Sequence, residues 1–262
     1  MNFSSLRYAL RGLSAYRTLL DDENESILDY ATTVLYTLAN GQKEQDEEER
    51  AEWGENALSA YACLFQALCD GGFSGIGGWL WDKLRYTETP FALSAQSDGA
   101  SPALEQAARR DVDALLALAG LDCGAILTAI AALLPPEQAS MVEAMPRWVS
   151  SAPFDFDRLV QFYRDHGAGL YARYRAFLWE DGQLVPVADP DCPKPEDLLG
   201  YEQQRSQVET NTRQMMAGHY ANNVLLFGDG GTGKSATVKS MLYLPGMEDL
   251  RLIEIQKENL TG

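Results

Sequence analysis

The chain has 262 residues, a length that suits one or two domains and is sufficient to bury a substantial apolar core. Its 21 Lys and Arg residues against 38 Asp and Glu residues give a formal net charge of −17. Because the basic residues are scattered and an acidic surface repels phosphate backbones, we expect no nucleic-acid partner. With 46% apolar and 23% charged residues, the composition excludes a disordered chain and indicates a globular protein.

Helical patterning dominates the first 176 residues. Arg7, Arg11 and Arg17 interrupt the apolar residues near the N-terminus, which argues against a secretory signal. From Ile27 onward, apolar residues recur at helical spacing, and aromatic side chains as far as Trp179 extend the pattern. Aromatic stripes of this kind are typical of a packed core. We therefore predict a mainly α-helical domain over residues 1–176, without a catalytic constellation.

Residues 115–134, LLALAGLDCGAILTAIAALL, have the length and apolar character of a membrane span. Gly120 is a helix stop, however, and Asp122 is a helix cap that would be costly in lipid. Pro135-Pro136 then ends the second half. We therefore predict two short buried helices and no membrane span.

The numbers and spacing of the cysteines and histidines indicate which metal sites and disulfides the chain can form. The sequence has no CxxC pair, and neither His166 nor His219 has a cysteine or a second histidine at ligand spacing, which argues against a zinc site. Four cysteines are too few for a disulfide scaffold in a chain of this length, and apolar free thiols are typical of a reducing compartment. The predicted location is cytoplasmic.

The pattern changes over residues 177–197, which we interpret as a connector. Asp181-Gly182 is a turn signal, QLVPV after it predicts a short strand, and three prolines follow between residues 188 and 197. Beyond the connector we predict a helix over 196–217, a strand at 221–227, a helix from Lys234 and a second strand at 251–255. This alternation is typical of the start of an α/β domain, predicted here over residues 198–262.

The strongest motif is GDGGTGKS at residues 228–235, a full match to the phosphate-binding loop GxxxxGK[ST], with an apolar run before it and a helix after it. Glycines allow the backbone to turn tightly around a phosphate, and backbone N–H groups can then bind the anion. Lys234 is expected to reach the β- and γ-phosphates, and the Ser235 hydroxyl to bind Mg²⁺. The predicted contact residues are Gly228, Asp229, Gly230, Gly231, Thr232, Gly233, Lys234, Ser235, Ala236 and Thr237.

The stretch DLLGYEQQRSQVETNTRQMMAGHYANNVLLFGDGGTGKSATVKSML, followed by LRLIEIQKENL, resembles an uncharacterised family of predicted AAA+ ATP-binding proteins. The resemblance covers residues 177–262 and implies a helical N-terminal region followed by an AAA+-like P-loop domain. It implies ATP and Mg²⁺ as cofactors, and a protein partner or self-association. It also implies that the adenine base lies against Leu199, Gly200 and Tyr201. His219-Tyr220 is less typical of the family, and we expect it to affect a loop only.

In that family, the Walker B strand, the sensor residue and the arginine finger that phosphoryl transfer requires lie downstream of the second strand. The sequence stops at Gly262 before any of them, so we expect a truncated ATPase. Glu254 in the second strand reads as an alternating surface carboxylate rather than a substitute base. The strands at 221–227 and 251–255 would not be neighbours, so we expect this part to be loosely held, rearranged or completed by another chain.

Three functions remain open from the sequence. The first is an AAA+ ATP-binding module whose parent protein couples hydrolysis to remodelling or regulation of a protein partner. The second is a P-loop kinase acting on a small acceptor, although such kinases usually carry the loop near the start of the chain. The third is a non-catalytic helical interaction protein with a vestigial nucleotide site.

Overall fold

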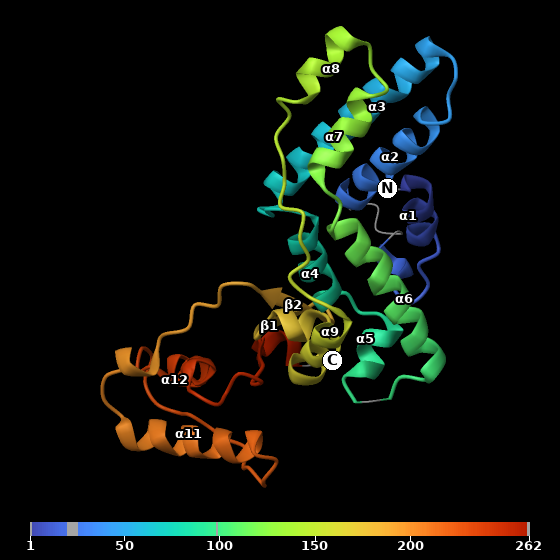
Figure 1. Cartoon of the computed structure of the whole chain (residues 1–262). Helices are drawn as coiled ribbons and strands as arrows, with labels where there is room; N and C mark the ends of the chain where they lie inside the picture. The colour runs from blue at the N-terminus through green and yellow to red at the C-terminus, as the bar shows by residue number, and fades with distance from the viewer. Residues whose placement is uncertain (1, 20–25, 98, 261–262) are drawn as a thin grey trace. The chain divides into compact units, whose positions relative to one another are not determined.

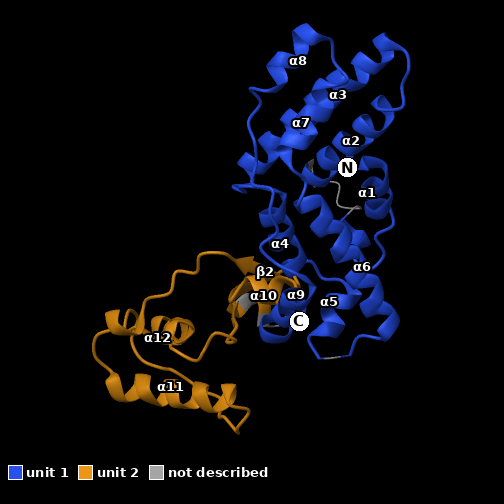
Figure 2. Ribbon diagram, viewed as in Figure 1, with its two compact units in different colours: residues 1–168 blue, residues 169–262 orange. Residues whose placement is uncertain are grey.

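The computed structural model describes residues 2–19, 26–97 and 99–260. The chain divides into two compact units, a helical unit at residues 1–168 and a C-terminal unit at residues 169–262 (Figure 2). The division lies N-terminal to the one predicted at 176/177.

The helical unit consists of helices, and a long extended segment over residues 143–155 connects α8 to α9 (Figure 1). Helices α2 and α3 lie side by side, and α7 packs against α3. Asp and Ser side chains begin several of the helices by accepting backbone N–H groups, as Asp46 does for Glu48 and Glu49. The elements are α1 (Phe3–Arg11), η1 (Arg17–Leu19), α2 (Ser26–Gly41), α3 (Glu47–Asp70), α4 (Ile76–Tyr86), α5 (Pro90–Ala95), α6 (Pro102–Ala119), α7 (Cys123–Ala131), α8 (Pro136–Val142) and α9 (Phe156–His166).

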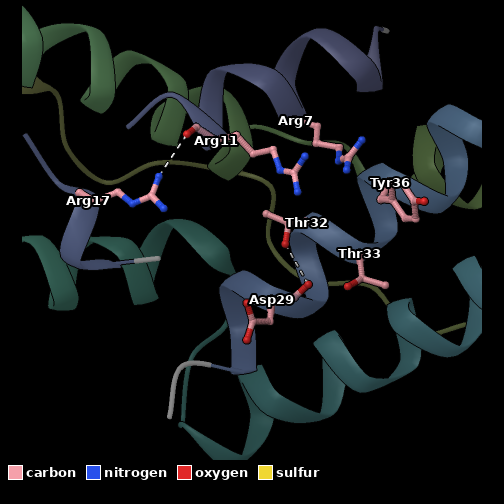
Figure 3. Close-up of a pocket in the computed structure, with 7 residues that line it drawn as sticks. All are labelled: Arg7, Arg11, Arg17, Asp29, Thr32, Thr33 and Tyr36. Atoms are coloured by element: carbon pink, nitrogen blue, oxygen red, sulfur yellow. Dashed lines mark hydrogen bonds between the residues drawn. The ribbon is translucent and has the colours of Figure 1, made fainter. Parts of the chain in front are cut away.

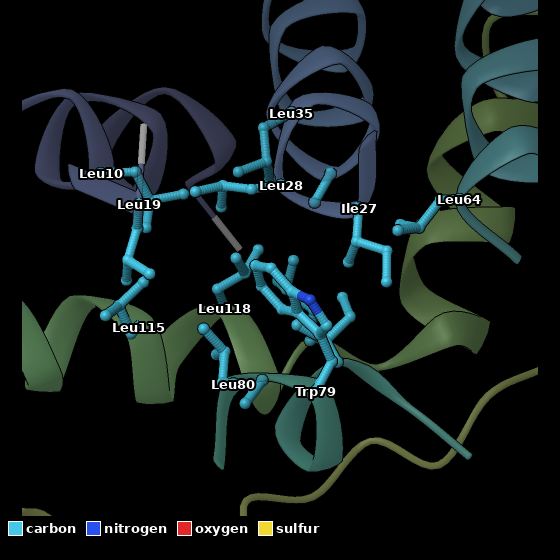
Figure 4. Close-up of a cluster of buried hydrophobic side chains, with 14 of the residues drawn as sticks. Leu10, Leu19, Ile27, Leu28, Leu35, Leu64, Trp79, Leu80, Leu115 and Leu118 are labelled. Carbon is cyan, nitrogen blue, oxygen red and sulfur yellow. The ribbon is translucent and has the colours of Figure 1, made fainter. Parts of the chain in front are cut away.

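A single apolar cluster forms the core of the helical unit. Figure 4 shows its centre, where leucines from α1, η1, α2 and α6 surround Trp79 and Leu80 of α4. Trp79 is 1% exposed and Leu80 is fully buried. The helical spacing seen in the sequence therefore corresponds to faces that pack on one another, and the predicted helical domain is confirmed in its class.

The apolar segment at 115–134 forms parts of two helices, as predicted. Gly120 is the C-cap of α6, and the Asp122 side chain caps α7 by accepting the N–H of Ala125. The two helices are bent by 67° at this break. Among the described residues, no single helix is long and apolar enough to cross a membrane.

The C-terminal unit contains a three-stranded mixed sheet in the order β2-β1-β3. β1 (Ala176–Glu180) pairs antiparallel with β2 (Gln183–Val187) and parallel with β3 (Leu252–Ile255). Asp181 and Gly182 have φ angles of 49° and 78°, the positive values that a two-residue hairpin turn requires. The predicted strands at 183–187 and 251–255 and the predicted turn are confirmed, whereas β1 was not predicted.

The remaining elements of this unit are α10 (Leu170–Arg173), η2 (Pro195–Asp197), α11 (Glu202–Met216), α12 (Lys234–Ser240), η3 (Met241–Tyr243) and η4 (Lys257–Leu260). Helices α11 and α12 confirm two predicted helices. The apolar core is small and consists of Ala176, Val208, Met241, Leu242, Met247 and Leu250, with partly buried neighbours.

The predicted strand at 221–227 is wrong, because these residues make no strand pairing. Both edges of β1 are occupied by β2 and β3, so the sheet offers this segment no place beside its central strand. The side chain of Asn211 instead bonds the N–H and the C=O of Asn222, each at 2.8 Å. Leu225 and Phe227 are 85% and 88% exposed. The segment is therefore an extended connection between α11 and the glycine-rich loop.

Candidate functional site

The glycine-rich loop at residues 228–233 leads directly into α12. Gly228, Gly231 and Gly233 have φ angles of 138°, 78° and 78°. L-residues with a side chain rarely adopt such angles, so the path of the loop depends on glycine at these positions. Gly233 is the N-cap of α12, and its carbonyl accepts the N–H of Thr237 at 2.8 Å.

The side chain of Lys234 closes the loop. Its ammonium group donates to the carbonyl oxygens of Gly228 and Asp229 at 3.0 and 2.6 Å and to Oγ1 of Thr232 at 3.2 Å. The Thr232 hydroxyl in turn donates to the carbonyl oxygen of Asp229 at 2.9 Å. The three donors of the lysine are thus used by oxygens of its own loop, which keeps the loop curled around a positive charge.

A cavity of about 260 Å³ opens beside this loop. It brings together predicted residues from two places in the sequence, Tyr201 at the start of α11 and the loop with α12. The lining residues predicted from the sequence are Tyr201, Gly228, Asp229, Thr232, Lys234 and Thr237. Its other lining residues, which the sequence did not suggest, are Gln204, Arg205, Leu226 and Phe227.

The remaining predicted residues do not line the cavity. Leu199 is 91% exposed, and Gly200 has a φ of 75° at the turn before Tyr201. Ser235 is exposed in the first turn of α12. The other residues outside the lining are Gly230, Gly231, Gly233 and Ala236 of the loop and of α12.

Arg205 is the most informative residue that the sequence did not suggest. Its guanidinium donates to the carbonyl oxygen of Pro195 at 3.1 Å and lies 3.8 Å from the carboxylate of Glu202. Its Nε is buried and has no hydrogen-bond partner among the residues that the structure describes. An unused buried donor on a cation at a cavity wall can bind an incoming acceptor. In the sequence, Arg205 looks like an ordinary helix residue three positions after an acidic one, so only the position of α11 identifies it.

Glu254, considered above as a substitute base, forms an ion pair with Lys239 at 2.9 Å. The hydrogen bond to this carboxylate raises the pKa of Lys239. Glu254 is not among the residues that line the cavity. It therefore joins β3 to α12 at the surface, in agreement with the prediction of a surface carboxylate.

A family model described as a protein of unknown function (DUF815) matches residues 172–262. The matched stretch lies within the C-terminal unit and includes the loop, the cavity and the sheet. Comparison with curated proteins gives no significant match, and comparison with solved structures gives none either. The match agrees with the resemblance to an uncharacterised family that the sequence indicated for this part of the chain.

Proposed function

We propose that the C-terminal unit binds ATP with Mg²⁺ at the loop of residues 228–235, as an AAA+-type P-loop module. We further propose that ATP hydrolysis is coupled to remodelling or regulation of a protein partner. The observation that carries the proposal is the position of the Lys234 ammonium group, held by loop oxygens at the wall of a cavity that also contains Tyr201.

The residues present fit such a ligand. Phosphate oxygens are stronger acceptors than neutral carbonyl and hydroxyl oxygens, so the Lys234 ammonium group can exchange its loop contacts for phosphate contacts. Tyr201 and Phe227 supply flat apolar surface for a base at the same cavity. The Ser235 hydroxyl would be the protein ligand for Mg²⁺, which supplies positive charge to the phosphates when it is bound.

ATP hydrolysis requires catalytic groups in addition to the residues that line the cavity. Within the described ranges, Asp229 is the only carboxylate that lines it. Phosphoryl transfer needs an acidic group for the metal and the attacking water, and a positive group for the developing charge. The lining of the cavity therefore favours the nucleotide-binding part of the proposal, and ATP hydrolysis depends on groups outside the cavity.

The test is titration of ATP·Mg²⁺ into the wild-type chain by calorimetry. We expect saturable binding that weakens at least tenfold in Lys234→Ala, because charge-assisted hydrogen bonds contribute about 1.5–3 kcal/mol each. Lys194→Ala is the matched control, since Lys194 is exposed and is not among the cavity's lining residues. Equal binding by the two variants, or no binding by the wild type, contradicts the proposal.

Two further readouts separate the types of P-loop protein. Assembly into a hexamer on addition of ATP, seen by light scattering, supports the AAA+ interpretation. A phosphorylated product from a mixture of small acceptors would indicate a kinase instead. A melting temperature unchanged by ATP·Mg²⁺ would indicate a non-catalytic interaction protein.

A further inference from the structure

A hollow of about 750 Å³ lies between α1 and α2 of the helical unit, far along the chain from the glycine-rich loop. Figure 3 shows the arginines of α1 extending toward the polar side chains of α2. This volume is in the range of sites that hold small metabolites. The hollow is lined by Arg7, Arg11, Arg17, Asp29, Thr32, Thr33 and Tyr36.

The hollow carries a cluster of positive charges, although the chain as a whole is negatively charged. Arg7 and Arg11 are one helical turn apart and share a face of α1, in a protein with a formal net charge of −17. No described carboxylate lies within 4.0 Å of either guanidinium, whereas Arg109 and Arg213 elsewhere do have such partners. Arg17 also lines the hollow but has other interactions, so the inference depends on Arg7 and Arg11.

The surroundings hold Arg7 in place. Its guanidinium carbon lies 4.2 Å from the centre of the Tyr36 ring. The Trp53 ring meets Tyr36 edge-on at a centroid distance of 5.7 Å. A guanidinium stacked in this way keeps its N–H groups available at the edge of its plane. The positive charge is therefore oriented, and it has no carboxylate partner within 4.0 Å in the part of the chain that the structure describes.

We propose that this hollow binds a small anion with at least two negative charges, of the phosphate or carboxylate class. Two guanidinium groups match such a ligand because each can donate two parallel hydrogen bonds to one phosphate or carboxylate. The Thr33 hydroxyl on the opposite wall can donate another. The formal net charge of −17 repels a long polyanion that would extend beyond the hollow, so the ligand is a small molecule rather than a nucleic acid.

The test is calorimetric titration with pyrophosphate and, separately, with citrate, in the absence of magnesium. It uses the chain carrying Lys234→Ala, so that binding at the glycine-rich loop is weakened, and the arginine variants below separate the two sites. We expect saturable binding of at least one of the two anions, with weaker binding at higher salt. The anion that binds more tightly assigns the ligand to the phosphate or to the carboxylate class.

Arg11→Gln and Arg7→Gln are each expected to weaken binding about tenfold, and Arg147→Gln to change it less than twofold. Arg147 is an exposed arginine of the same unit, so its substitution makes the same change in net charge. Arg11 is also exposed, so its substitution leaves the fold intact even if loss of the Arg7–Tyr36 contact does not. Absence of saturable binding, or equal weakening by Arg11→Gln and Arg147→Gln, would overturn the proposal.

Discussion

Asp111 is a buried acidic side chain that holds backbone groups in the core of the helical unit. Its carboxylate is 1% exposed and accepts the backbone N–H groups of Ser14, Ala15 and Tyr16 at 2.6, 2.7 and 3.2 Å. Arg110 pairs with it at 2.9 Å. One buried charge thus attaches the turn between α1 and η1 to α6.

We expect Asp111→Asn to lower the free energy of unfolding by about 2–4 kcal/mol, because two buried N–H groups and one part-buried N–H group lose a charged acceptor and meet an amide that also carries donors. The matched control is Asp113→Asn on the same helix, at an exposed position, with an expected change below about 0.5 kcal/mol. Urea unfolding followed by circular dichroism measures both. Similar values for the two variants would show that the carboxylate does not hold the turn.

Tyr16 and Tyr163 form a buried hydroxyl pair in the same unit. Tyr163 donates to the carbonyl oxygen of Leu84 at 2.6 Å, and the two hydroxyl oxygens are 3.2 Å apart. Since the proton of Tyr163 is used by Leu84, Tyr16 is the donor within the pair. Burial and then the neighbouring Tyr163 raise the pKa of Tyr16 well above the usual value for tyrosine.

A raised pKa of Tyr16 makes the helical unit sensitive to alkali. The unfolded chain releases this proton near pH 10 while the folded chain keeps it, so the contribution of Tyr16 to stability is constant well below pH 10 and falls above it. The free energy of unfolding falls with pH at up to about 1.4 kcal/mol per pH unit for each proton that only the folded chain retains. Tyr16→Phe should reduce the slope between pH 10 and 11 by up to about one proton, and Tyr8→Phe, at an exposed position, should leave it unchanged. Chemical unfolding at stepped pH checks this, and an unaltered slope in Tyr16→Phe is the contrary result.

At the scale of elements, α4 shows how closely a helix and a loop can approach. A methyl group on Gly77 would overlap the carbonyl oxygen of Ser151, which belongs to the segment that runs beside the start of the helix. The backbone of that segment is attached there by the N–H of Val149, which donates to Ser74 at 2.8 Å. By contrast, a methyl group on Gly78 has no described atom outside its own helix backbone within 4 Å.

These two adjacent glycines give opposite predictions. Gly77→Ala should destabilise the protein by about 1–3 kcal/mol, because the backbone of the segment has to move. Gly78→Ala should stabilise it by about 0.5–1 kcal/mol, because alanine restricts the unfolded chain and favours the helix. The melting temperatures of both variants, compared with that of the wild type, test these predictions. A higher melting temperature for Gly77→Ala would show that the segment is not packed on α4.

The elements that the sequence predicted are those whose determinants are local. Gly120 and Asp122 end one helix and begin the next through their own backbone and side chain, so their position in the sequence suffices. Strand β1 was missed because its aromatic residues continue a helical spacing, and only pairing with β2 and β3 makes it extended. Pairing also explains the error at 221–227, since an apolar run becomes a strand only where it pairs with another strand, and this segment does not pair with the outer edge of β2 or of β3.

The candidate site divides in the same way. The loop and Lys234 follow from eight consecutive residues, and the positive φ angles of its glycines agree with that pattern. The presence of Arg205 and Phe227 at the same cavity depends on how α11 lies beside the loop, and no local pattern contains that information. The same is true of the hollow between α1 and α2, where Arg7 and Tyr36 come from different helices.

At the scale of the whole molecule, the two units have unequal cores. The helical unit encloses one large cluster with several aromatic side chains, whereas the core of the C-terminal unit consists of six buried apolar residues. Hydrophobic stabilisation scales with the apolar area removed from water, so the smaller core contributes less. We therefore expect the C-terminal unit to open at a lower free energy than the helical unit does.

The expected difference in stability between the two units allows a test of which unit the nucleotide stabilises. In hydrogen exchange followed by mass spectrometry, peptides of α11 and α12 should exchange faster than peptides of α3 and α6. Met247 is 1% exposed in the small core, so Met247→Ala should increase the exchange rate of the α11 and α12 peptides only. ATP·Mg²⁺ at about 100 times its Kd should protect the C-terminal unit by up to about 2.7 kcal/mol and leave α3 unchanged. Lys234→Ala should remove that protection, whereas Lys194→Ala should keep it. Equal protection of both units would show that the nucleotide does not act through the loop alone.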